Sequence, residues 1–237
     1  MSQVSTTDGT ILAFDIGGSN LKATVLSPTG ERLQEYKKTP TPNPCTPAAM
    51  IAALKGLAGN FEGFDKVSVG FPGYVQRDGV VKTAPNLGTD LWAGVNLVER
   101  LSETLQKPVR MVNDADLQGL GVVSGEGLEL VITLGTGFGT AFLLNGRLLP
   151  HLEIGQHPFT KNKSYDGYVG EQAFQEVGEE HWNERMKKVL ATLKTVFNYD
   201  RLYIGGGNAK KLNFALEENM TLVSNKDGIK GGARLWA

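Results

Sequence analysis

The sequence of 237 residues is short of cysteine and carries no excess of charge. Its single cysteine, Cys45, can form neither an internal disulfide nor a cysteine-based zinc cage, so we expect a protein of the reducing cytoplasm. Lys and Arg number 24 against 25 Asp and Glu, which gives a formal net charge of -1. This balance argues against a nucleic-acid partner and against a membrane-surface role.

Long hydrophobic runs are also missing. No segment approaches the roughly 18 consecutive apolar residues of a membrane span, and residues 1–10 lack the basic start and apolar core of a signal peptide. We therefore expect a soluble, cytoplasmic protein. With 41% hydrophobic residues, the chain can bury a core, and it has room for one large domain or two of about 120 residues.

Glycine, by contrast, is plentiful and falls in clusters. Residues 15–20 (DIGGSN) and 134–139 (LGTGFG) each follow an apolar run that predicts a buried strand, and each precedes a β-rich run. Each cluster is therefore predicted to be the tip of a hairpin. Because glycine has no Cβ, backbone N–H groups at such a tip can approach a phosphate closely. A Rossmann or Walker A motif needs a helix directly after its glycines, so these turns indicate a phosphate clamp of another kind.

A third cluster, formed by Gly205, Gly206 and Gly207, follows the apolar strand predicted at 201–204. One such cluster alone is usually an ordinary tight turn. Three clusters, each after a predicted strand, favour a ligand site.

The second half of the chain repeats the architecture of the first: a glycine-tipped hairpin, then a helix, then a strand that ends in a glycine turn. This repetition predicts a two-lobed α/β protein with a ligand cleft between two mixed-sheet lobes. We place a small N-terminal lobe at 1–112 plus 226–237 and a large C-terminal lobe at 113–225.

Local signals predict further elements. Thr46 and Pro47 are expected to be the N-cap and first residue of a helix. Apolar residues spaced three or four apart predict helix over 169–198, with Trp182 as a core aromatic. His151 and His157 are interpreted as surface-loop residues.

Asn113 and Asp114 follow a predicted buried strand at 108–112, at the strand end where open α/β sheets bind ligands. A carboxylate there can accept the proton of a substrate hydroxyl that attacks a phosphoryl group. The alternative is that Asp114 only caps the following helix. Local sequence favours neither interpretation.

Other charged residues have two interpretations as well. Asp15 either fixes its turn through its side chain or holds a hydrated Mg²⁺ that bridges donor phosphates. The lysines after the second hairpin and after the third glycine cluster are either solvated surface or a track for a long polyanion. These lysines are Lys161, Lys163, Lys210 and Lys211.

In order and spacing, the glycine clusters together with residues 70–73 (GFPG), 84–87 (APNL) and 113–116 (NDAD) resemble the motifs of the ROK sugar kinases. This family is part of the actin/hexokinase/Hsp70-like ATPase superfamily, and the chain is most similar to its polyphosphate glucokinase branch. The resemblance covers residues 11–236. It implies a two-lobed ribonuclease H-like (actin-like ATPase) fold, Mg²⁺ with ATP and/or polyphosphate as donor, and a homodimer.

The resemblance also implies a role for individual residues. Asp114 is expected to be the catalytic base, and the sugar ligands are expected to be Asn113, Glu153, Gln156, Asn86 and Gly73. The phosphate-binding residues are expected to be Asp15, Gly17, Gly18, Ser19, Asn20, Lys22, Gly135, Thr136, Gly137 and Gly139, with Asp15 also binding the metal. Gly205, Gly206 and Gly207 are expected on the nucleotide side.

The chain departs from the family pattern at two places. It lacks the cysteine cluster of the zinc-binding members, so no zinc is expected, and the polyphosphate branch lacks that cluster too. The sugar-binding Glu-x-Gly-His motif ends here in Gln156, which can still donate and accept hydrogen bonds but cannot become positively charged.

We expect a kinase acting on a hexose hydroxyl, namely the 6-OH of glucose. The alternatives are a kinase for mannose, fructose or an N-acetylhexosamine, and a non-catalytic sugar-binding sensor. Repressors of this family carry an N-terminal helix-turn-helix domain, for which the ten residues before the first predicted strand leave no room.

Overall fold

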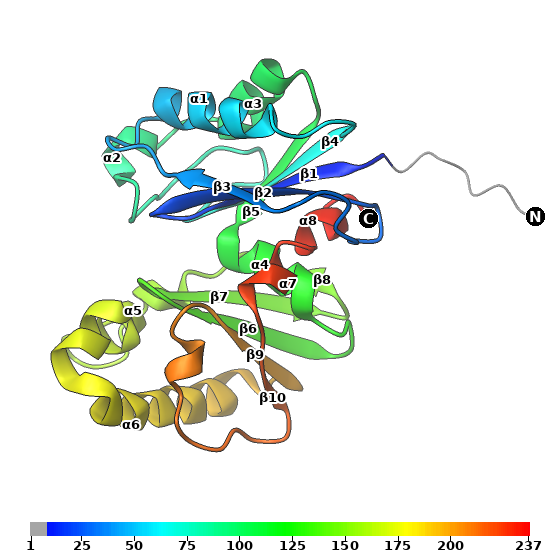
Figure 1. Ribbon diagram of the computed structural model, residues 1–237. Helices are drawn as coiled ribbons and strands as arrows, with labels where there is room; N and C mark the ends of the chain where they lie inside the picture. Colours follow the sequence, from blue (N-terminus) through cyan, green and yellow to red (C-terminus); the bar gives the residue numbers. More distant parts are fainter. Residues whose placement is uncertain (1–8) are drawn as a thin grey trace, which may run out of the picture. The chain divides into compact units, whose positions relative to one another are not determined.

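The computed structural model describes residues 9–237, so most of the segment tested for a signal peptide lies outside the described residues. The chain divides into two compact units. The first consists of residues 9–121 together with Ile229–Ala237, and the second is the continuous segment Val122–Gly228. Each unit contains one five-stranded mixed sheet (Figure 1).

The sheet of the first unit has the strand order β3-β2-β1-β4-β5. Strands β1 and β2 form an antiparallel hairpin, whereas β4 pairs in parallel with both β1 and β5. The carboxyl ends of β1, β4 and β5 therefore lie at the same edge of the sheet. The bounds are β1 Ile11–Ile16, β2 Asn20–Leu26, β3 Lys37–Pro40, β4 Lys66–Phe71 and β5 Val109–Asn113.

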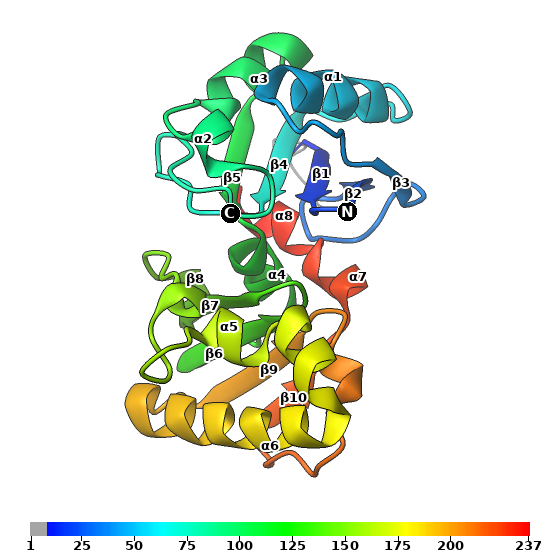
Figure 2. The same cartoon turned by 90° about the vertical axis from the view of Figure 1, so that its left-hand side faces the viewer.

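The helices of this unit cover both faces of its sheet (Figure 2). Helix α1 begins as predicted, because the Thr46 hydroxyl accepts a hydrogen bond from Ala49 N at 3.2 Å and Pro47 is the first helical residue. The core between α1, α3 and the sheet includes Phe14, Met50 and Leu101, each fully buried. The bounds are α1 Pro47–Ala58, α2 Thr89–Trp92, α3 Leu97–Leu105, α4 Asp114–Val122 and α8 Gly231–Arg234.

Helix α8 returns to the first unit and packs against β1 and β4. Ser68 Oγ of β4 donates a hydrogen bond to Gly232 O at 2.6 Å and accepts one from Trp236 Nε1 at 2.9 Å. A Cβ at Gly231 would overlap Leu117 O, so the backbone of α8 touches that of α4. Residues 229–237 are thus part of the core of the first unit.

The sheet of the second unit has the order β10-β9-β6-β7-β8. Its hairpin, β6 with β7, is antiparallel, and β9 pairs in parallel with β6. The repeated architecture predicted from the sequence is confirmed. The bounds are β6 Leu128–Leu134, β7 Phe138–Leu144, β8 Arg147–Leu148, β9 Arg201–Gly205 and β10 Met220–Leu222.

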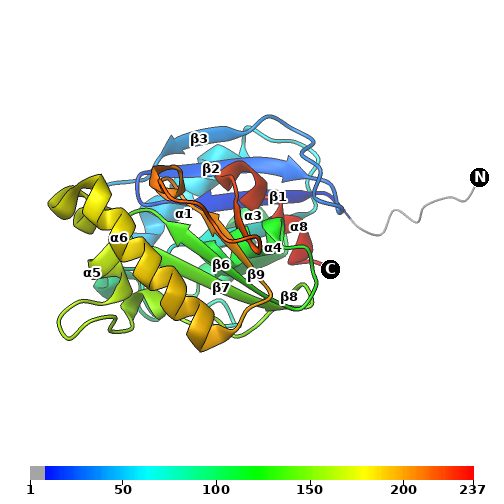
Figure 3. The same cartoon turned by 90° about the horizontal axis from the view of Figure 1, so that it is seen from below.

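A long helix, α6, crosses one face of this sheet (Figure 3). Trp182 is fully buried, as predicted for a core aromatic, and its Nε1 donates a hydrogen bond to Val169 O at 2.8 Å. The single helix predicted over 169–198 is wrong in two details. Gly170 is extended between α5 and α6, and Gly178, with φ of 75°, kinks α6.

The remaining elements of the second unit are short. None of the helices within residues 9–237, α6 included, combines the length and apolarity that a bilayer crossing requires. The bounds are η1 Ile154–Gln156, α5 Tyr165–Val169, α6 Glu171–Phe197, η2 Ala209–Lys211 and α7 Asn225–Gly228.

The contact of Gly231 with α4 predicts a large effect of one added methyl group. Gly231→Ala is expected to lower the free energy of unfolding by about 1–3 kcal/mol, because the Cβ must displace backbone atoms. Gly56→Ala in α1 is the matched control, since an added Cβ there meets nothing within 4 Å. That control should be stabilising by roughly 0.5–1 kcal/mol. Urea denaturation measures both changes, and a Gly231→Ala protein as stable as wild type contradicts the close packing.

Candidate active site

The functional residues predicted in the first unit meet at the carboxyl edge of its parallel strands. Asp15 of β1 lies opposite Gly70 of β4, and Phe71 of β4 lies opposite Asn113 of β5. The first phosphate turn, residues 70–73 and the Asn113–Asp114 pair are therefore neighbours. This edge is where open α/β sheets bind their ligands.

Asn113 anchors the segment that follows β4. Its side chain is buried, its Nδ2 donates a hydrogen bond to Gly73 O at 3.0 Å, and its Oδ1 accepts one from Ala115 N at 2.8 Å. A Cβ at Gly73 would overlap Thr83 O, so only glycine allows this close approach of two backbone segments. Asn113 thus fixes the position of Gly73 and of the start of α4 together.

Asp114 is the first residue of α4, and the position before it, the N-cap, belongs to Asn113. The bond from Ala115 N to Asn113 Oδ1 is the one expected of an N-cap side chain. Asp114 Oδ1 also accepts from Ala115 N, at 2.9 Å. The start of α4 therefore does not depend on Asp114 alone.

Lys22 supplies a positive charge at this edge. Its Nζ lies 2.9 Å from Asp15 Oδ2, across the hairpin formed by β1 and β2. Burial lowers the pKa of Lys22, but the charges of Asp15, Tyr36 and Asp114 and the hydrogen bond to Asp15 together raise it above its ordinary value. Lys22 therefore stays protonated beside the turn predicted to bind phosphate.

The first phosphate turn is held in place by its own backbone and by Thr41. Gly17 N donates to Asn20 O at 3.0 Å, and Thr41 Oγ1 donates to Gly17 O at 2.6 Å. Gly18 and Ser19 are exposed. A Cβ at Gly18 would lie 3.7 Å from Asn86 Cβ, so the structure brings the predicted sugar ligand Asn86 next to this turn.

In the second unit, the second phosphate turn packs against the third glycine cluster. Gly206 has φ of 90°, and a Cβ on it would overlap Leu134 O. Asn208 N donates to the same carbonyl at 2.9 Å, and Glu171 N donates to Gly135 O at 3.0 Å. The third glycine cluster is thus in contact with Leu134, the residue directly before Gly135 of the second predicted phosphate turn.

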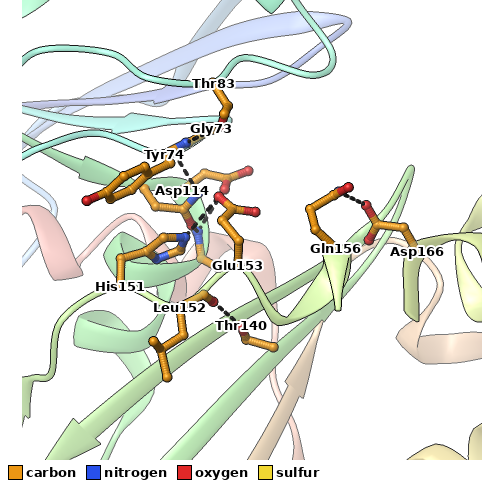
Figure 4. A network of polar contacts seen from close by, with 12 residues as sticks. Gly73, Tyr74, Thr83, Asp114, Thr140, His151, Leu152, Glu153, Gln156 and Asp166 are labelled. Atoms are coloured by element: carbon orange, nitrogen blue, oxygen red, sulfur yellow. Dashed lines mark hydrogen bonds and ion pairs between the residues drawn. The ribbon is translucent and has the colours of Figure 1, made fainter. Parts of the chain in front are cut away.

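The motif predicted to bind the sugar follows β8 in the second unit. His151 Nε2 lies 3.0 Å from Glu153 Oε1, and Thr140 Oγ1 donates to Leu152 O at 2.8 Å (Figure 4). The interpretation of His151 as a surface residue is wrong, because only 9% of its side chain is exposed and it forms an ion pair or hydrogen bond with Glu153. Sequence alone did not reveal this pairing.

Asp166 of α5 is a second residue that the sequence did not reveal. Its Oδ2 accepts a hydrogen bond from Gln156 Nε2 at 2.7 Å, and its Oδ1 accepts one from Phe138 N at 2.6 Å. Asp166 lies in a segment that matches none of the motifs, so no local signal distinguishes it. Its position joins the end of the predicted sugar-binding motif to Phe138 of the second glycine cluster.

The lysines proposed as a polyanion track differ in their surroundings. Lys163 pairs with Glu176 at 3.2 Å. Lys211 pairs with Glu171 at 3.2 Å and lies over the Phe174 ring at 3.6 Å from its centroid. The remaining two lysines, Lys161 and Lys210, are exposed.

The chain matches known proteins over nearly its whole length. The model of the ROK family matches residues 11–157. The chain is 31% identical to the polyphosphate glucokinase of Mycobacterium leprae (strain TN), over 93% of this chain and 72% of that protein. It is also 31% identical to the polyphosphate glucokinase of Mycobacterium tuberculosis (strain CDC 1551 / Oshkosh), over 93% of this chain and 88% of that protein.

Solved structures show the same fold. The inorganic polyphosphate/ATP-glucomannokinase of Arthrobacter sp. strain KM superimposes with a TM-score of 0.85 at 27% identity, covering 96% of this chain and 98% of that one. A ROK family glucokinase from Streptomyces griseus, in complex with glucose and AMPPNP, superimposes with a TM-score of 0.77 at 18% identity, covering 96% and 99%. The predicted fold class is confirmed, and the chain belongs to the ROK family.

Proposed function

We propose that this protein is a sugar kinase that transfers a phosphoryl group from ATP and/or polyphosphate to the 6-hydroxyl of glucose. The observation that carries the proposal is the convergence of Asp15, Lys22 and Asp114 at one sheet edge of the first unit. A base, a cation and a metal-binding carboxylate in one place form a sufficient set for phosphoryl transfer. The 31% identity to polyphosphate glucokinases supports the choice of acceptor.

In this proposal Asp114 accepts the proton of the sugar hydroxyl while its oxygen attacks the transferred phosphorus. A general base contributes about 10²–10⁴-fold to rate. Glu153, Gln156, Asn113 and Gly73 are proposed sugar ligands, and the hydrogen bond from Asn113 Nδ2 to Gly73 O holds the last two together. Asn86 is the remaining sugar ligand.

Donor phosphates are held mainly by backbone groups in this proposal. The N–H groups of residues 17–20 and 135–139 face them, and Lys22 neutralises part of their charge. Within residues 9–237 no group of three or more His, Cys, Asp or Glu side chains forms a metal cage. The single carboxylate of Asp15 is enough to hold Mg²⁺, because this ion prefers one or two carboxylates together with water and substrate phosphates. When bound, Mg²⁺ neutralises the charge that develops on the phosphates.

The replacement of the family histidine by Gln156 bears mainly on which hexose accepts the phosphoryl group. A kinase for mannose, fructose or an N-acetylhexosamine has the same catalytic residues, and a panel of these hexoses assayed with ATP and with polyphosphate identifies the substrate. Glucose binding without turnover on either donor supports the sugar-sensor alternative instead. We also propose a homodimer, for which light scattering gives the mass.

The role of Asp114 is tested by replacing its carboxyl with an amide. Asp114→Asn is expected to lower kcat by at least about 10²-fold, with a smaller effect on glucose affinity, because only the proton acceptor is lost. A coupled assay for glucose 6-phosphate gives kcat, and calorimetry gives the affinity. Asp90→Asn, at an exposed position of α2, is the control and should leave kcat unchanged. Turnover at the wild-type rate in Asp114→Asn excludes it as the base.

The donor is tested through the exposed lysines of the second unit. Replacing Lys161 and Lys163 together with alanine should weaken polyphosphate use more than ATP use, because a long polyanion presents more charges to be neutralised. Polyphosphate affinity should also fall more steeply with salt. Glu176→Gln is the control: it removes the partner of Lys163 and should preserve or strengthen polyphosphate use. Equal losses for the two donors count against a polyphosphate track.

A further inference from the structure

The Asp166 carboxylate lies in a space that two motif glycines leave open. A Cβ at Gly137 of the second phosphate turn would lie 2.9 Å from Asp166 Oδ1, and a Cβ at Gly155 of the sugar-binding motif would lie 2.6 Å from the same atom. At both positions a Cβ would come too close to the carboxylate oxygen, so any residue other than glycine would force Asp166 to move. The absence of a Cβ at these two glycines therefore lets one carboxylate contact both segments. Figure 4 shows the hydrogen bond between Asp166 and Gln156.

The two oxygens of Asp166 bind different segments. Oδ1 accepts from Phe138 N at 2.6 Å, at the first residue of β7, and Oδ2 accepts from Gln156 Nε2 at 2.7 Å, at the last residue of η1. Burial raises the pKa of Asp166, whereas the bond from Phe138 N lowers it, the charge of Glu153 raises it and the bond from Gln156 lowers it. The pKa of Asp166 is raised overall, with burial as the largest cause, and the two donors oppose this rise by favouring the charged carboxylate.

This pairing fixes which end of the Gln156 amide is available to a ligand. A glutamine amide has an acceptor oxygen at one end and a donor NH₂ at the other, whereas an ionised carboxylate can only accept. Nε2 therefore faces Asp166, and Oε1 faces away from it. A half-turn of the amide would bring two acceptors together and is disfavoured.

Helix capping does not explain the position of Asp166. The N-cap of α5 is Ser164, whose hydroxyl accepts a hydrogen bond from Gly167 N at 3.2 Å. The Asp166 carboxylate instead contacts β7 and η1. Its contacts are therefore directed at the proposed ligand-binding segments.

We infer that Asp166 is a positioning residue that holds Gln156 with its Oε1 as the acceptor for a sugar hydroxyl and ties that amide to the end of the second phosphate turn. The inference rests on the proposed function, because it assigns the sugar to Gln156. The inference implies that the sugar hydroxyl bound by Gln156 donates a hydrogen bond to Oε1. Asp166 thereby determines specificity without touching the sugar.

The first experiment tests the pairing without any ligand. In ¹H–¹⁵N spectra of the full chain, Asp166→Asn should move the Phe138 backbone amide and the Gln156 side-chain amide to lower proton shift, since both lose a charged acceptor. The Gln156 signals are those that disappear in Gln156→Met. Asp200→Asn is the matched control, because Asp200 Oδ2 accepts a backbone hydrogen bond from Leu128 N at 2.7 Å elsewhere in the same unit. Unmoved Phe138 and Gln156 signals in Asp166→Asn overturn the inference.

The second experiment tests the direction of the hydrogen bond. Calorimetry compares glucose with its deoxyfluoro derivatives at C1 to C4, in which fluorine cannot donate. Wild type should bind one derivative about tenfold more weakly than glucose, the loss expected for one hydrogen bond. In Asp166→Asn the Gln156 amide is free to turn, so the ratio of the affinities for glucose and for that derivative should fall at least about threefold. The kcat with glucose should change less than the KM. Gln156→Met should lose the same discrimination, which keeps the test decisive if Asp166→Asn does not fold.

The outcomes separate this inference from the proposed function. A wild-type ratio that persists in Asp166→Asn overturns the role of Asp166, whatever the kinase activity. If no hexose is turned over but the Phe138 and Gln156 signals shift as expected, the proposed kinase activity is overturned. The hydrogen bonds of Asp166 to Phe138 and Gln156 are then still established. Unchanged discrimination in Asp200→Asn supports the assignment, and a loss there as large as in Asp166→Asn contradicts it.

Discussion

The geometry of each unit depends on one strand that has an antiparallel partner on one side and a parallel partner on the other. In the first unit β1 is antiparallel to β2 and parallel to β4, so its carboxyl end must both turn back sharply and lie beside the ends of β4 and β5. Asp15 is therefore directly opposite Lys22 and close to Asn113 in the sheet. In the second unit β6 has the same two kinds of partner, β7 and β9, which brings the turn after Leu134 against Gly206.

Close backbone contacts explain one glycine in each unit. A Cβ at Gly17 would lie 2.9 Å from Asn20 O of its own turn, and a Cβ at Gly206, which follows β9, would overlap Leu134 O at the end of β6. The same lack of side chains leaves backbone N–H groups accessible to an anion.

Local signals were enough to predict much of the fold. The hairpins follow from apolar runs interrupted by glycine, and the start of α1 follows from Thr46 and Pro47, because turns and caps depend on residues adjacent in sequence. The ROK motifs also indicated which residues would meet at the edge of the first sheet. The break at Gly170 was missed because the apolar spacing continues through it while the backbone does not.

The residues that sequence reasoning missed make contacts that depend on tertiary packing. Asp166 bonds to Phe138, 28 residues earlier, and only the approach of α5 to β7 brings them together. His151 pairs with Glu153 two residues away, but its burial depends on how the segment after β8 is packed. Neither residue type nor spacing contains that information. The details of the sugar-binding motif therefore had to come from the structure.

The return of residues 229–237 to the first unit has a consequence for how the protein folds during synthesis. The second unit is continuous in sequence, whereas the first unit consists of two segments with the whole second unit between them. Until residues 229–237 are made, the first unit lacks the hydrogen bonds of Ser68 Oγ to Gly232 O and from Trp236 Nε1. Domains fold as units once their chain is complete. Residues 9–121 therefore cannot complete their core before residues 229–237 have been made, and until then one face of the N-terminal sheet is uncovered by α8.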